Sequence, residues 1–131
     1  MKTISKVALS LSLLISVSAS QAADPQTFLK LYSGESKEAP SAQRGEKFFS
    51  SKHGNEWSCS SCHGMPPTGE GKHASTNKAI APLAPSFNSD RFTDSAKVDK
   101  WFKRNCNDVL GRVCTPSEKA DVLAYLLSLK K

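Results

Sequence analysis

The sequence lacks any apolar run long enough to cross a bilayer. Its longest apolar stretch, roughly from Val7 to Val17, is too short for an ordinary membrane helix, which needs about 20 apolar residues. Two lysines precede this stretch, and small residues ending at Ala22 follow it. This pattern predicts a secretory signal peptide over residues 1–22. We therefore expect one exported domain over residues 23–131 with no membrane anchor.

Acidic residues are also scarce, with 12 Asp and Glu against 18 Lys and Arg. Two of the lysines fall in the predicted signal peptide, which leaves 16 basic residues against 12 acidic ones, a net charge of +4. A basic balance favours docking onto an acidic protein partner. The lysines are scattered and lack the interleaved aromatic residues of a nucleic-acid surface, so we expect no nucleic-acid binding.

Cysteine is sparse, but two of the four cysteines stand in a specific arrangement. Cys59 and Cys62 are followed directly by His63 in the stretch "CSSCH". Two thiols at this spacing can add to the two vinyl groups of one porphyrin, so the motif predicts one covalently attached haem c. His63 then becomes the fifth ligand of the iron. Covalent haem attachment suits an oxidising compartment, and we expect a periplasmic protein.

The other two cysteines, Cys106 and Cys114, are predicted to form a disulfide, with two free thiols as the alternative. The loop they close is short, so its entropic contribution to stability is only about 2 to 3 kcal/mol. Its larger effect would be to fix the turn after the third predicted helix.

Methionine, the usual sixth iron ligand in electron-transfer cytochromes c, is nearly absent beyond the signal peptide, where only Met65 remains. Met65 follows His63 by two residues, a reach of at most about 7 Å, which is too short to pass around the porphyrin. His53 and His73 are far enough from the motif along the chain to reach the other side of the iron, but they lie in loops rich in charge or glycine. A lysine would first have to lose a proton whose pKa is about 10.4. An open site or a weak ligand remains.

Four helices are expected from capping residues and apolar spacing. They cover residues 24–34, 41–51, 93–111 and 115–131. The last has the strongest signals, because Thr115 and Glu118 form a capping box around Pro116. Between the second and third helices, the proline-rich residues 65–90 are expected to form a long irregular loop that wraps the haem.

Two expectations concern packing. Gly45 lies inside the second helix, where it costs about 1 kcal/mol relative to alanine, and this predicts close packing against the last helix with Tyr125 over Gly45. The third helix is expected to carry Val98, Trp101 and Phe102 on one side.

Four stretches together resemble one family of class I cytochromes c. They are "SAQRGEKFF", "CSSCHG", "KAIAPLAPS" and "DRFTDSAKVDKWFKRNCNDVLGRVCTPSEKADVLAYL". Together they are similar to the sphaeroides haem protein (SHP) family over nearly the whole chain beyond the signal peptide. The most specific parts are the Arg-Phe-Thr-Asp run and the tripeptide RNC. The resemblance implies an all-α class I cytochrome c fold with long haem-wrapping loops.

The resemblance also implies a ligand set and partners. The asparagine of the RNC tripeptide, Asn105 here, would be the sixth ligand opposite His63, with a Cys106–Cys114 disulfide beside it. Electrons would come from a dihaem cytochrome c and a membrane cytochrome b. Only the carbonyl oxygen of an amide can bind metal, and oxygen donors suit ferric iron better than ferrous iron. Reduction should therefore release Asn105 and open the iron to O2, NO or CO.

We therefore predict a periplasmic monohaem cytochrome, high-spin when reduced, that binds O2 or NO and exchanges electrons with redox partners. Haem-dependent oxygen or nitric oxide turnover stays open as an enzyme activity. The alternative is a simple electron-transfer cytochrome c with a histidine as sixth ligand.

Overall fold

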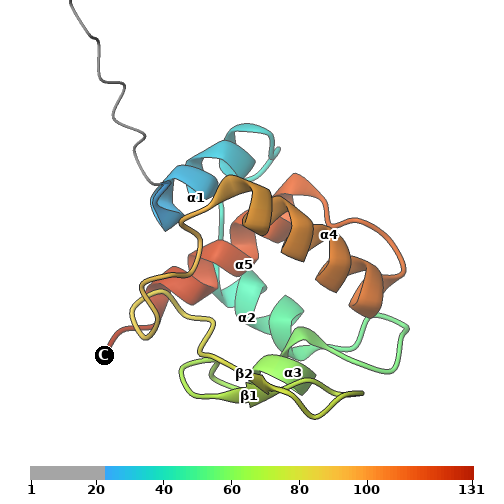
Figure 1. The fold of residues 1–131 in the computed structure, drawn as a ribbon. Helices are drawn as coiled ribbons and strands as arrows, with labels where there is room; N and C mark the ends of the chain where they lie inside the picture. Colours follow the sequence, from blue (N-terminus) through green and yellow to red (C-terminus); the bar gives the residue numbers. More distant parts are fainter. Residues whose placement is uncertain (1–22) are drawn as a thin grey trace, which may run out of the picture.

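The structure is a computed structural model that describes residues 23–131, so the predicted signal peptide lies outside the described residues. Its elements in chain order are α1 (Pro25–Gly34), α2 (Ala42–Ser50), α3 (Cys59–His63), β1 (Gly71–Lys72), β2 (Ala79–Ile80), α4 (Ser95–Leu110) and α5 (Pro116–Ser128). The expected all-α class is confirmed, with one small hairpin added (Figure 1). Among the described residues no helix has the length and apolarity that a membrane crossing requires.

The longer helices begin where the sequence predicts. Each first turn donates a backbone hydrogen bond to a capping side chain, supplied by Asp24, Ser41, Asp94 and Thr115. Such caps satisfy N–H groups that lack a partner within the helix. Helix α5 is shorter than expected, because it ends at Ser128 and the two C-terminal lysines lie beyond it.

Helix α5 is the centre of the fold, with α1 and α2 both packed against it (Figure 1). The predicted role of Gly45 is confirmed. A Cβ atom at this position would overlap the backbone carbonyl of Asp121 and lie 3.0 Å from the Cβ of Tyr125. Only glycine allows α2 and α5 to approach this closely.

A buried carboxylate fixes the same helix pair. Asp121 is 7% exposed and accepts hydrogen bonds from the Ser41 backbone N–H at 2.6 Å and from the Arg44 Nε and Nη2 at 2.8 and 2.9 Å. Buried charges are tolerated when they are paired in this way. The first turn of α2 is therefore tied to the middle of α5.

One expectation differs from the structure. The loop over residues 65–90 is not wholly irregular, because Gly71 pairs with Ile80 and Lys72 with Ala79 in a short antiparallel hairpin. The expectation for α4 is confirmed, because Val98, Trp101 and Phe102 all line one cavity beside this helix. Residues three and four positions apart lie on the same side of a helix, as the spacing of these three residues predicts.

Candidate haem site

The Cys-x-x-Cys-His motif forms its own short helix, α3, for local reasons. Ser58 caps the helix by accepting from the Ser61 N–H, and the Ser61 hydroxyl accepts from the Ser58 N–H in return. Gly64 ends the helix with a φ of 77°, a left-handed conformation that favours glycine. Cys59, Cys62 and His63 are thereby held on one rigid turn.

The β1–β2 hairpin supports this helix from outside. A Cβ atom at Gly71 would overlap the carbonyl oxygen of Cys62 and lie 3.0 Å from the Cα of His63. The backbone N–H of Ala74 donates to the Cys62 Sγ at 3.4 Å. The hairpin therefore presses directly on the backbone of the motif, which explains why a glycine stands at position 71.

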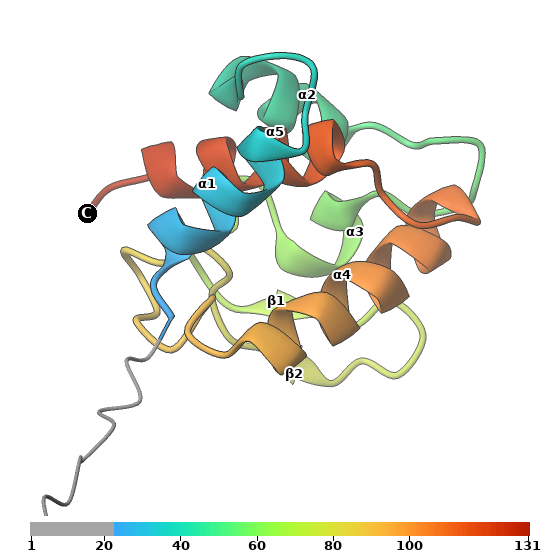
Figure 2. The same ribbon diagram turned by 90° about the horizontal axis from the view of Figure 1, so that it is seen from above.

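A cavity of about 650 Å³ opens beside the motif. Helix α4 lines it opposite α3, and Figure 2 shows the two helices facing each other. Its apolar walls include Phe49, Ile80, Leu83, Val98, Phe102 and Leu126. This volume and apolar character are typical of cofactor sites.

Cys59, Cys62 and His63 all line this cavity. Both thiols are unbonded, as haem attachment requires. Burial raises the pKa of Cys59 to about 11.

His63 has the properties of an axial ligand. Burial, together with the charge of Arg91, lowers its pKa to about 4, so the ring is neutral at pH 7 and keeps a free lone pair. Its Nδ1 is buried and has no hydrogen-bond partner among the described residues. A buried polar atom without a partner is costly. The place of the His63 ring in the cavity wall, beside Cys59 and Cys62, fits a covalently bound haem c.

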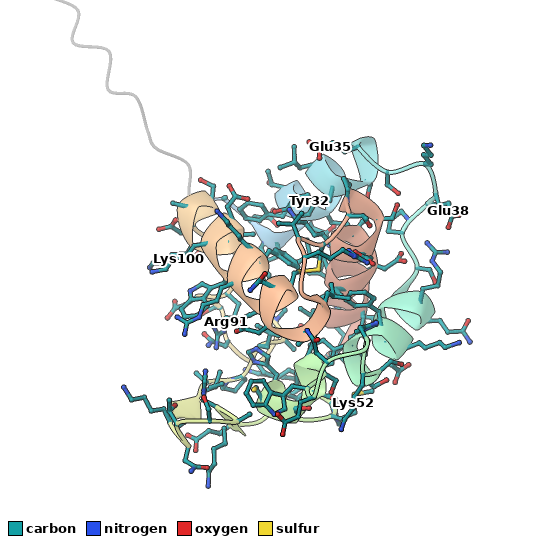
Figure 3. All side chains as sticks on the ribbon, turned by 90° about the vertical axis from the view of Figure 1, so that its right-hand side faces the viewer. Tyr32, Glu35, Glu38, Lys52, Arg91 and Lys100 are labelled. Carbon is teal, nitrogen blue, oxygen red and sulfur yellow. A yellow bond between two sulfur atoms is a disulfide. The ribbon has the colours of Figure 1, made fainter. Side chains whose placement is uncertain are left out.

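Arg91 is a site residue that our reading of the motifs did not single out. Its Nε and Nη2 donate to the carbonyls of Pro82 at 2.9 Å and Ala81 at 2.6 Å, which leaves N–H groups for another acceptor. It lines the cavity, and burial lowers its pKa. No carboxylate pairs with it among the described residues, so this guanidinium (labelled in Figure 3) would hold a haem propionate. The sequence signal that could have pointed to Arg91 is the Arg-Phe-Thr-Asp run, of which it is the first residue.

The structure separates the candidates for the sixth position. Met65 is 48% exposed and lies outside the cavity lining, where it accepts a hydrogen bond from the Tyr125 hydroxyl at 3.5 Å. His53 also lies outside it, with its Nε2 2.8 Å from the Phe48 carbonyl oxygen. His73 does line the cavity, but it sits beside the hairpin that packs on α3, and its Nδ1 accepts from the Thr76 N–H at 3.3 Å.

Asn105 lines the cavity from α4. It is five residues before the end of α4, which Gly111 caps in a left-handed conformation, so Asn105 is not a helix cap. Its side-chain amide has no hydrogen bond to any described residue, although it is partly buried. Asn105 is therefore placed on the helix that faces His63 with its amide free, while ligation itself stays a prediction.

The residue after Asn105 belongs to the predicted disulfide. The Sγ atoms of Cys106 and Cys114 lie at bonding distance, with their Cα atoms 5.5 Å apart, which is a usual separation for a disulfide. Both cysteines are buried and line the cavity. The link connects the C-terminal turns of α4 to the segment that enters α5.

Known proteins similar to this chain are c-type cytochromes. The cytochrome c-type protein SHP of Cereibacter sphaeroides is 55% identical over 89 residues, 65% of this chain and 68% of that protein. Cytochrome c'' of Methylophilus methylotrophus is 49% identical over 98 residues, 72% of this chain and 68% of that protein. Residues 35–126 match a family model described as a domain of unknown function, DUF1924.

Solved structures agree with these relatives. Oxidised SHP, described as an oxygen-binding cytochrome c, matches with a TM-score of 0.77 and 46% identity, over 82% of this chain and 99% of that one. Oxidised cytochrome c'' matches with a TM-score of 0.74 and 42% identity, over 82% of this chain and 95% of that one. The expected cytochrome c fold is confirmed. The chain therefore belongs to the DUF1924 family, and within it to the SHP group of monohaem cytochromes with one covalently attached haem c.

Proposed function

We propose that this chain is a periplasmic cytochrome in which Asn105 occupies the sixth position of the iron only in the oxidised protein, so that the reduced protein is high-spin and binds O2 or NO. The bound haem supplies one-electron redox chemistry and an iron position open to a diatomic ligand. The observation that carries the proposal is the Asn105 side chain, which lines the cavity from α4 with its amide unpaired among the described residues.

The chemistry of Asn105 supports redox-dependent release. The amide nitrogen gives its lone pair to resonance, so only the carbonyl oxygen can bind metal, and this hard donor suits ferric iron better than ferrous iron. Once released, the side-chain NH2 is a donor that can bond to a diatomic molecule nearby. The same side chain would thus serve as a ligand in one redox state and as a hydrogen-bond donor in the other.

The relatives support the same behaviour. The matched SHP structure is described as oxygen binding, and a solution structure of cytochrome c'' is described for its insights into haem-ligand detachment. The proposed electron donors are a dihaem cytochrome c and a membrane cytochrome b.

Absorption spectra of the ferric and ferrous holoprotein test the ligand directly. We expect a six-coordinate ferric form, a five-coordinate high-spin ferrous form, and loss of the ferric sixth ligand in Asn105→Val with CO binding retained. Asn107→Val is the matched control, because Asn107 lies on the same helix but outside the cavity lining. An Asn105→Val protein that keeps the wild-type ferric spectrum rules out Asn105 as the ligand.

The second candidate function is simple electron transfer with a histidine ligand. Only His73 remains for it, because His53 lies outside the cavity lining. A low-spin ferrous spectrum that His73→Ala converts to high-spin would support this function against our proposal.

A further inference from the structure

Met65 is an exposed thioether that stands directly after the haem motif. It follows His63 by two residues, is 48% exposed and lies outside the cavity lining, so a haem in the cavity would not cover it. It is the only methionine beyond residue 22. On the surface it borders an open depression along α2, whose other lining residues are Gln43, Arg44, Glu46, Lys47 and Ser50.

The sulfur of Met65 is the partner of a buried tyrosine. Tyr125 of α5 is 3% exposed, and its hydroxyl donates to the Met65 Sδ at 3.5 Å. Among residues 23–131 this hydroxyl has no other hydrogen-bond partner. Burial, together with the charge of Glu46, raises the pKa of Tyr125, so the hydroxyl keeps its proton at pH 7 and acts as a donor. A thioether is a weak acceptor, so this buried donor is poorly satisfied.

We propose that Met65 is a site of reversible oxidation by hydroperoxides, and that its sulfoxide fastens the segment after the haem motif to α5 through the Tyr125 hydroxyl. A sulfur lone pair attacks the terminal oxygen of the hydroperoxide, and the O–O bond breaks as the S–O bond forms. The leaving oxygen takes the proton, so the products are the sulfoxide and an alcohol, or water from hydrogen peroxide. The sulfur loses two electrons and the peroxide gains them.

The sulfoxide should stabilise this protein. Methionine oxidation usually disrupts a core, because it places a polar group among apolar side chains. Met65 is half exposed, so its flexible side chain can turn the new oxygen toward Tyr125 without burying it fully. The Tyr125 hydroxyl then gains an oxygen acceptor in place of a sulfur one. This inference does not depend on which residue binds the iron opposite His63.

Reactivity is tested on the ferric, haem-loaded protein with tert-butyl hydroperoxide, in the presence of N-acetylmethionine as an exposed reference. Peptide mass spectrometry locates the added oxygen, and an unchanged haem absorbance shows that the cofactor is intact. We expect one oxygen atom on the peptide that contains Met65. A Met65 that stays unmodified after the reference is consumed overturns the assignment of an oxidation site.

The link to Tyr125 is tested by thermal unfolding before and after oxidation. We expect oxidation to raise Tm by about 3 °C in the wild type. Treatment with the two methionine sulfoxide reductases, one for each epimer, should reverse the rise. Tyr125→Phe keeps the ring and lacks the hydroxyl, so its Tm should not rise on oxidation. An equal rise in this variant would point to another donor, such as Gln43 or Lys47 in the same depression, and overturns the link.

A second comparison needs neither oxidant nor a change at Tyr125. Met65→Gln offers the hydroxyl a carbonyl oxygen at a similar reach, whereas Met65→Leu keeps the apolar bulk and offers no acceptor. We expect the holoprotein with glutamine to unfold about 3 °C above the one with leucine. Equal Tm values would show that an acceptor at position 65 does not stabilise the protein, which also overturns the link.

Discussion

Replacing Gly45 by alanine tests the helix crossing on which the site is built. In an unobstructed helix this change should stabilise the protein by about 0.5 to 1 kcal/mol, because alanine has the higher helix propensity. At Gly45 the new methyl group would overlap the backbone carbonyl of Asp121 on α5. A carbonyl within a buried helix turn cannot rotate away, so α2 and α5 must separate.

The size of the effect is the cost of overpacking and of separating the helices, less the gain from the higher helix propensity of alanine. Overpacking of a close contact costs about 1 to 3 kcal/mol, and separation would also weaken the contact between Phe49 of α2 and Tyr125 of α5, whose rings are 5.6 Å apart. We expect a net loss of about 2 kcal/mol in the free energy of unfolding. For a domain of this size that corresponds to a fall of about 10 °C in Tm.

Urea unfolding of the holoprotein, followed by far-UV circular dichroism, measures this loss. Gly34→Ala is the control, because Gly34 is also helical and has no atom within 4 Å of an added Cβ. The control should be unchanged or slightly stabilised. If Gly45→Ala proves as stable as the control, the helix crossing does not require glycine and the packing argument is wrong.

Three further predictions concern the site and its surroundings. Gly71→Ala should lower the fraction of protein with covalent haem, measured as haem absorbance per protein, whereas Gly69→Ala, which meets no atom within 4 Å, should not. A hydrogen bond from Arg112 lowers the pKa of Glu118. The stabilisation that ionised Glu118 contributes is therefore present above its pKa in the unfolded chain and is lost as the pH falls through its pKa in the folded protein. Glu118→Gln should thus cost about 0.5 kcal/mol at pH 7, because an ion pair this exposed is screened by water, and the difference from wild type should shrink in acid; a constant difference in urea unfolding would contradict this. The denatured holoprotein should expose no reactive thiol, and two would disprove the bond between Cys106 and Cys114.

The sequence alone predicted the features that depend on neighbouring residues. Capping side chains such as Ser41 and Thr115 begin helices because they satisfy N–H groups one turn away. The haem motif is equally local, since two thiols and a histidine within five residues already have the right spacing. The packing of Gly45 was predictable because a glycine inside a helix has a cost that close contact explains.

Features that join distant segments required the fold. The hairpin escaped prediction because strands of two residues carry no periodicity, and their pairing depends on the α3 backbone against which Gly71 packs. Val98, Trp101 and Phe102 were expected on one side of α4, but only the orientation of that helix shows that this side lines the haem cavity.

The sequence by itself determined the helices, the haem-binding motif and the pair of cysteines left for a disulfide, because each is specified by residue types at short separations. The tertiary structure decided which side chains surround the haem. It excluded His53 and Met65 from the cavity lining and placed α4, which carries Asn105, opposite His63. It also left Arg91 without a carboxylate partner among the described residues. The physical reason is that a cavity is formed by elements remote in the chain, and spacing along one helix does not fix how that helix is turned toward another.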